Sequence, residues 1–135
     1  MNAKRTIYIT ATDMTRLRAL IAAHRDPRED IKTLAGELDR AEVVSPAEVP
    51  RNVITMNSEA CLRELETNDA ITYRLVFPEQ ANIDERRISV LAPIGTAMLG
   101  QREGDEFQWE VPEGLVRLRV EKIMYQPEAA GHYHL

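Results

Sequence analysis

The groups in this sequence with the clearest capacity for chemistry form an acidic cluster, Asp26-Pro27-Arg28-Glu29-Asp30. Asp26 and Glu29 stand three residues apart, and carboxylate oxygens are ligands that Mg²⁺ prefers in proteins. At the end of a projecting helical hairpin, such a cluster could carry a metal ligand into a partner's active site. The alternative, which we favour, is a solvated loop whose acids stabilise the amino-terminal end of the next helix through its dipole.

The remaining reactive side chains form no recognisable site. His132 and His134 could chelate a metal weakly in an extended segment, but no third ligand stands near them in the sequence. Cys61 is the only cysteine, which excludes an intrachain disulfide, and its apolar surroundings predict a small buried hydrophobe. Metal-site, phosphate-loop and hydrolase motifs are missing. We therefore expect no catalytic residues, no metal, no cofactor and no enzymatic activity.

Composition and charge restrict the class of partner. The 135 residues carry a formal net charge of −5, which argues against direct binding to duplex DNA. Residues 51–135 hold nine Lys and Arg against fourteen Asp and Glu, so this part either meets a basic surface on a partner or is a solvated acidic face. Without a signal-peptide core or a stretch of transmembrane length, and with one cysteine, the sequence predicts a cytoplasmic protein that does not bind membranes.

Two helices are predicted around the acidic cluster. Thr10 with Asp13 resembles a helix cap, and apolar residues follow at helical spacing until Asp26-Pro27 ends the helix. A second apolar stripe begins near Arg28 and includes Leu34 and Leu38. Together they predict an antiparallel helical hairpin, a short coiled coil about 20–24 Å long at 1.5 Å per residue. We expect this hairpin, residues 10–43, to pack as a unit separate from the rest of the chain.

The pattern changes from helical to strand-like after Ser45-Pro46, where Glu48 completes a predicted capping box. Alternating apolar residues then predict a sheet, so the expected fold is α+β: a domain at 1–50 with the hairpin, and an antiparallel sheet domain with one short helix at 51–135. The predicted strands are 53–56, 60–65, 71–77, 88–91, 106–111 and 115–125.

Residues 88–105 combine a strand, a break at Pro93 and Gly95, one helical turn at 96–99, a glycine stop at Gly100 and a turn into the next strand. This segment resembles the signature of the carboxy-terminal domain of the Gre transcript-cleavage factors. The blocks Val53-Ile54-Thr55-Met56-Asn57-Ser58 and Tyr125-Gln126-Pro127-Glu128-Ala129-Ala130-Gly131 narrow the resemblance to the Rnk family, regulators of nucleoside diphosphate kinase.

The resemblance implies an FKBP-like sheet domain that binds RNA polymerase at the entrance of the secondary channel. It implies that the chain competes there with Gre factors without stimulating transcript cleavage. The contact loop would be Pro93, Ile94, Gly95, Thr96 and Ala97, and we expect Ile94 to be exposed there as a small apolar contact.

The rival function is a transcript-cleavage factor. In Gre factors a tip pair Asp-x-x-Glu holds the catalytic Mg²⁺, and Asp26 and Glu29 reproduce this spacing, with Arg28 between them and Asp30 after them. The predicted hairpin is about half as long as we would expect of a Gre finger, however. We therefore expect no stimulation of cleavage.

A more distant alternative is a prolyl isomerase, since FKBP-type isomerases line their pocket with aromatic side chains. Candidates here are Tyr73, Phe77, Phe107, Trp109 and Tyr125. Phe107 and Trp109 alternate onto one face of a predicted strand, so we expect them to lie in the core instead.

Overall fold

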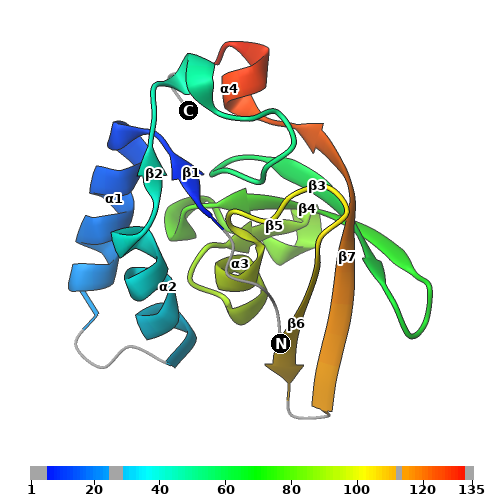
Figure 1. The fold of residues 1–135 in the computed structure, drawn as a ribbon. Coiled ribbons are helices and arrows are strands. Elements are labelled where there is room, and N and C mark those ends of the chain that lie inside the picture. Colours follow the sequence, from blue (N-terminus) through cyan, green and yellow to red (C-terminus); the bar gives the residue numbers. More distant parts are fainter. Residues whose placement is uncertain (1–5, 25–28, 112–113, 133–135) are drawn as a thin grey trace.

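The protein is described by a computed structural model that covers residues 6–24, 29–111 and 114–132. Its fold is α+β, as predicted, with two helices near the amino terminus and a mostly antiparallel sheet (Figure 1). The helices are α1 (Ala11–Ala22), α2 (Glu29–Asp39), α3 (Pro93–Met98) and α4 (Pro127–Ala130). The strands are β1 (Tyr8–Ile9), β2 (Glu42–Val43), β3 (Glu59–Glu64), β4 (Ala70–Val76), β5 (Arg87–Ser89), β6 (Glu106–Val111) and β7 (Gly114–Tyr125).

Helix α1 begins where the sequence predicts. Thr10 is extended, and its hydroxyl accepts a hydrogen bond from the Asp13 amide at 3.3 Å. A second predicted cap stabilises the 3₁₀ turn η1 (Pro46–Glu48), where Glu48 accepts from the Ser45 amide at 3.1 Å and from its hydroxyl at 2.9 Å. These bonds lower the pKa of Glu48 and confirm the predicted capping element.

The main sheet has the strand order β5-β4-β3-β7-β6. Its pairs are antiparallel except for β4 and β5, which run parallel. The expectation of a wholly antiparallel sheet is therefore wrong at this edge. Two 3₁₀ turns, η2 (Pro78–Gln80) and η3 (Ile83–Glu85), carry the chain around so that β5 returns in the direction of β4.

The predicted strand at 53–56 is a buried extended segment without a ladder. Val53 makes one isolated bridge with Arg102, and Ile54 exchanges backbone hydrogen bonds with Gln101 and Gly100 at 2.8 and 2.9 Å. Asn57, with φ 67°, then turns the chain into β3. All four residues of the segment are buried, so the alternation of inward and outward side chains that a half-buried strand would show is absent from 53–56.

The hairpin does not pack as a separate unit, so that expectation is wrong. One hydrophobic core contains Leu17 of α1 and Leu34 and Leu38 of α2 together with residues of the sheet and α3. The short strands β1 and β2, before α1 and after α2, pair in parallel at Tyr8↔Glu42 and Ile9↔Val43. These leucines are each no more than 1% exposed, because the sheet and α3 cover the apolar stripes together with the facing helix. The division of the chain near residue 50 stays a prediction.

Other predicted core positions have mixed outcomes. Phe107 is buried, as expected, while the side chain of Trp109 lies outside the description. Cys61 is only half-buried because it faces outward from β3, beside Lys122 of β7. Within the part of the chain that the structure describes, no helix has the length and apolar character that a membrane crossing requires.

Candidate functional site

The predicted contact segment, 93–97, is a helix rather than an exposed loop. Pro93 takes the first helical position of α3, and the Thr96 amide donates to the Ala92 carbonyl at 2.9 Å. The helix thus begins three residues before the turn at 96–99 that the sequence predicts, because proline initiates it instead of breaking it. Gly100 then stops the chain with φ 86°, as expected.

Burial within α3 differs from the sequence prediction. Ile94 is 9% exposed and belongs to the hydrophobic core, and Gly95 and Thr96 are also buried. The expectation that Ile94 is displayed to a partner is wrong, because the helix turns this side chain inward. Pro93 is exposed and Ala97 is half-buried, so these two residues form the accessible part of the segment.

Gly95 is required by a close approach of two backbones. A Cβ at this position would lie 2.0 Å from the Ser89 carbonyl oxygen and 2.9 Å from its carbon. The oxygen is fixed in place, since it accepts a hydrogen bond from the Ala92 amide at 3.0 Å. Within the Pro-Ile-Gly motif, the glycine therefore serves the packing of α3 against the end of β5.

The acidic tip is described only in part. Asp26 and Arg28 lie outside the described residues, Glu29 is the exposed first residue of α2, and Asp30 lies in α2 with its side chain outside the description. With 12 and 11 residues, α1 and α2 extend about 18 and 17 Å at 1.5 Å per residue. Both helices lie along the flank of the body in Figure 1, where α2 packs against α3.

A buried polar cluster, which sequence reasoning missed, joins two distant segments, 50–58 and 126–128. Thr55 donates to Glu128 Oε1 at 2.7 Å and lies 2.9 Å from the Ser58 hydroxyl. Gln126 donates to the carbonyls of Pro50 and Val53, both at 2.8 Å. These residues come from the two blocks that carry the Rnk resemblance. The polar residues within these two blocks were the only hint of such a cluster in the sequence. Only the fold brings residues 55 and 128 together.

Asp13 of α1 is a second buried carboxyl group, and the charge of Glu128 acts on it. It is 2% exposed, and no described residue donates a hydrogen bond to its Oδ1. Burial, followed by the nearby Glu128 charge, raises the pKa of Asp13 to about 6, whereas Arg16 and the Thr10 hydroxyl act in the opposite direction. Asp13 therefore lies in the first turn of α1, and its raised pKa makes its carboxyl group harder to ionise than an ordinary aspartate.

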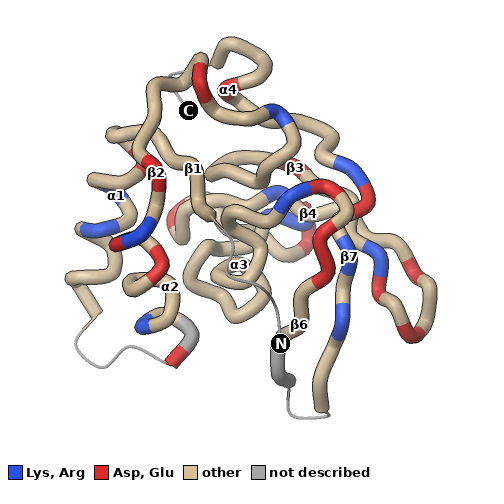
Figure 2. The backbone as a smooth tube through the Cα atoms, in the orientation of Figure 1, with Lys and Arg blue, Asp and Glu red and all other residues tan. Residues whose placement is uncertain are grey.

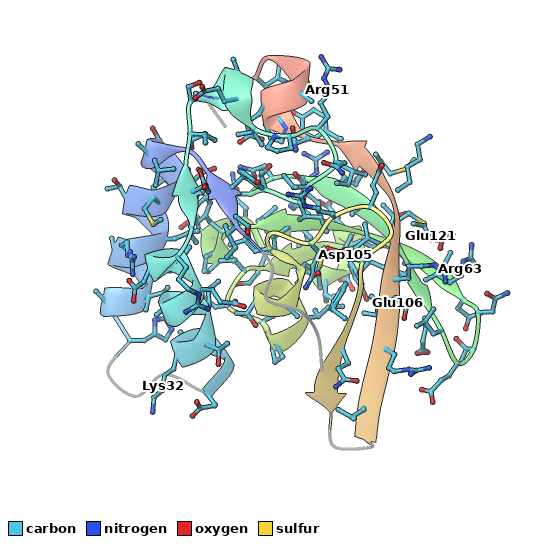
Figure 3. All side chains as sticks on the ribbon, viewed as in Figure 1. Lys32, Arg51, Arg63, Asp105, Glu106 and Glu121 are labelled. Atoms are coloured by element: carbon cyan, nitrogen blue, oxygen red, sulfur yellow. The ribbon has the colours of Figure 1, made fainter. Side chains whose placement is uncertain are left out.

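The outer face of the sheet is charged but nearly balanced. Arg63 lies 3.3 Å from Glu121, and Arg119 lies 2.8 Å from Glu121 and 3.8 Å from Glu106. Lys and Arg are interspersed with Asp and Glu over β3, β6 and β7 (Figure 2), and the labelled Arg63, Glu106 and Glu121 gather beside β7 (Figure 3). Exposed pairs of this kind add little stability. Their balance gives this face no strong attraction for a phosphate backbone.

Comparison with known proteins finds a matching family for each of the two parts of the chain. The family described as "Rnk N-terminus" matches residues 5–44, and the one described as "Transcription elongation factor, GreA/GreB, C-term" matches residues 49–125. The "Regulator of nucleoside diphosphate kinase" of Escherichia coli K12 is 45% identical over 103 residues, which are 76% of each chain. The chain belongs to the Rnk family, within the Gre superfamily.

GreA relatives from the wider superfamily also match this Rnk-family chain, but the match covers a smaller share of each GreA sequence. A "Transcription elongation factor GreA" from Syntrophotalea carbinolica is 35% identical over 95 residues, which are 70% of this chain and 60% of the relative. The solved structure "Prokaryotic transcription elongation factor GreA/GreB from Nitrosomonas europaea" superposes with a TM-score of 0.79 and 37% identity. It covers 90% of this chain and 100% of the other, so the two share one fold over nearly their whole length.

Proposed function

We propose that this chain is a cytoplasmic regulator that binds RNA polymerase at the entrance of the secondary channel and competes there with Gre-type factors. In this proposal it does not stimulate transcript cleavage. The match of residues 49–125 to the GreA/GreB carboxy-terminal family supports the polymerase as partner. The finer comparisons of the sheet domain with FKBP and of the hairpin with a coiled coil remain predictions.

The packing of the hairpin against the sheet is the main support for the proposal that the chain does not stimulate cleavage. Leu17, Leu34 and Leu38 are each no more than 1% exposed, in one core with the sheet. Helices of about 18 and 17 Å that are fixed along the body cannot also project as a long finger. Mg²⁺ accepts little error in ligand position, with distances near 2.0–2.1 Å. The pair Asp26 and Glu29 would therefore not reach a distant scissile phosphate.

Cleavage assays on backtracked elongation complexes test this proposal. Added alone, the chain should leave the rate of 3′-end cleavage unchanged. In a second assay the Gre factor is subsaturating and the chain is present at about ten times the Kd of the chain for the polymerase. The chain should then slow Gre-stimulated cleavage about tenfold, because it occupies most of the shared binding sites. Unchanged Gre-stimulated cleavage, despite measured binding, would contradict competition. Acceleration by the chain alone that disappears in Asp26→Ala or Glu29→Ala would establish the cleavage-factor alternative.

The accessible edge of α3 offers a separate test of the binding surface. Pro93→Glu places a charge on the exposed first residue of the helix, where the dipole tolerates an acid, so we expect the fold to persist. An unpaired charge within a partner contact should weaken polymerase binding at least about tenfold, or 1.4 kcal/mol. Pro46→Glu is the matched control, since Pro46 opens η1 in a different part of the chain. Equal binding by the two variants and the parent would exclude α3 as the contact.

The isomerase alternative receives no support from the four candidate aromatic side chains that the structure describes. Phe77 and Phe107 are buried in the core, Tyr73 packs against it, and Tyr125 contacts His132 and the Arg74 guanidinium. An open pocket of about 370 Å³ lies between η1 and α4. Aliphatic and charged residues line it, among them Val49, Arg51 and Glu128.

A further inference from the structure

The pocket between η1 and α4 has no part in the proposed function. These two elements pack against each other, and the pocket has a volume of about 370 Å³. Most of its wall comes from residues 46–47 and 128–131, which lie outside the segments that match the two families. Its volume is at the low end of the roughly 300–1,000 Å³ of small-molecule sites. The pocket therefore has the size for a small ligand.

One charge of the pocket lies within its wall. The Glu128 carboxylate is 7% exposed and accepts a hydrogen bond from the Thr55 hydroxyl at 2.7 Å. Among the described residues this is its only hydrogen bond, and none of them forms an ion pair with it. The charge of Glu128 also acts on the buried Asp13, which is itself an acid and supplies no counter-charge. A carboxylate removed from water is costly unless a cation compensates it, so the wall favours a ligand with a positive charge.

The opposite charge lies at the mouth of the pocket. Arg51 lines the pocket and is exposed, and Figure 3 shows it beside α4. Its guanidinium makes no ion pair or hydrogen bond with another residue in the described part of the chain. A guanidinium presents a fork of N–H donors that matches the two oxygens of a carboxylate. The mouth therefore favours a ligand with a negative charge.

The rest of the wall is mainly aliphatic and built from short side chains. These are Pro46, Ala47, Val49, Ala129 and Ala130. Such a surface suits a small apolar body and offers no aromatic ring on which a base or sugar could stack. The matching ligand is therefore a small aliphatic molecule with a cationic and an anionic end.

We propose that this pocket binds a free dipeptide with small aliphatic side chains, with its ammonium group on Glu128 and its carboxylate on Arg51. In a dipeptide the two charges lie at opposite ends, which matches a buried carboxylate and an exposed guanidinium. A free α-amino acid carries both charges on one carbon. The proposal does not depend on the proposed function, and its test contains no polymerase, so either can fail without the other.

Titration with L-alanyl-L-alanine, followed by the NMR shifts of backbone amides, tests the site. We expect saturable shifts that include Ala47, Ala129 and Ala130. N-acetyl-L-alanyl-L-alanine lacks the ammonium group and should bind at least about tenfold more weakly, because Glu128 is buried. L-alanyl-L-alaninamide lacks the carboxylate and should bind about threefold more weakly, because ion pairs at exposed positions such as Arg51 are worth less.

Two substitutions remove the charges of the pocket one at a time. Glu128→Gln keeps an acceptor for the Thr55 hydroxyl, and it should no longer distinguish the dipeptide from its acetylated form. Arg51→Gln should no longer distinguish the dipeptide from its amide. The exposed Glu66 and Arg117 provide matched controls, and Glu66→Gln and Arg117→Gln should bind all three probes as the parent does. A variant that had merely unfolded would also lose the discrimination that belongs to its remaining charge.

Three results would overturn the proposal. The first is the absence of saturable shifts in the pocket up to about 10 mM dipeptide, beyond the millimolar range of weak specific binding. The second is discrimination among the three probes that stays unchanged in either variant, since the charges would then not be recognised as assigned. The third is binding of L-alanine as tight as that of the dipeptide, which would contradict the separation of the two charges.

Discussion

Ile94→Asp is expected to lower the free energy of unfolding by about 3–5 kcal/mol, a large part of the 5–15 kcal/mol that holds a typical domain folded. Ile94 is 9% exposed and packs in the core formed by α3, the sheet and the N-terminal helices. The substitution removes apolar burial and places a carboxylate where water is excluded. Urea or thermal denaturation measures the loss, and near-ultraviolet circular dichroism reports whether side-chain packing survives at all.

Ile83→Asp is the matched control for this prediction. Ile83 lies in η3 and is 64% exposed, so the same chemical change should alter stability by no more than about 0.5 kcal/mol. Similar effects at both positions would show that Ile94 is not buried in solution. The comparison also affects binding assays, because loss of polymerase binding by Ile94→Asp would report unfolding, whereas Pro93→Glu tests the surface itself.

Gly95→Ala is expected to cost about 3 kcal/mol, which is unusual for the addition of one methyl group. The new Cβ would lie 2.0 Å from the Ser89 carbonyl oxygen, a backbone atom held by its hydrogen bond from Ala92. Relief requires α3 to move away from the end of β5, and this movement would loosen Ile94 and Met98 in the core. Chemical denaturation should show a lower midpoint with an unchanged slope if the fold persists.

Gly36→Ala provides the opposite expectation for the same substitution. Gly36 lies inside α2, and nothing lies within 4 Å of an added Cβ. Alanine is the better helix former, so we expect a gain of about 0.5–1 kcal/mol. A loss at Gly36, or a neutral result at Gly95, would contradict the packing described for these two helices.

The Pro-Ile-Gly-Thr-Ala segment, 93–97, is therefore mainly a structural element and only in part an accessible surface. Ile94, Gly95 and Thr96 are buried, so three of its five residues build the core end of α3. A partner can reach Pro93 and part of Ala97, together with the half-buried Leu91 and Ala92 beside them. A sequence signature can therefore mark a binding site while most of its residues support the element that presents it.

Much of this protein followed from local sequence patterns. Both N-terminal helices, the Ser45-Pro46 turn, the glycine stop at Gly100 and five of the six predicted strands lie close to their predicted positions. Helix caps, turns and side-chain periodicity depend on residues within a few positions of one another, so the sequence carries them directly. The blocks at 53–58 and 125–131, together with residues 88–105, were likewise sufficient to indicate the family that the comparisons confirm.

Tertiary structure decided the features that depend on distant segments. It determined that the hairpin shares a core with the sheet, that β5 runs parallel to β4, and that Ile94 faces inward. It also brought Thr55 and Glu128 together in one buried hydrogen bond and buried the carboxyl group of Asp13. Local periodicity shows that a face is apolar but not what covers it, and polar residues separated by more than 70 positions meet only when the chain folds. The physical reason is that burial and charge coupling belong to the whole packed molecule and not to any one segment of its sequence.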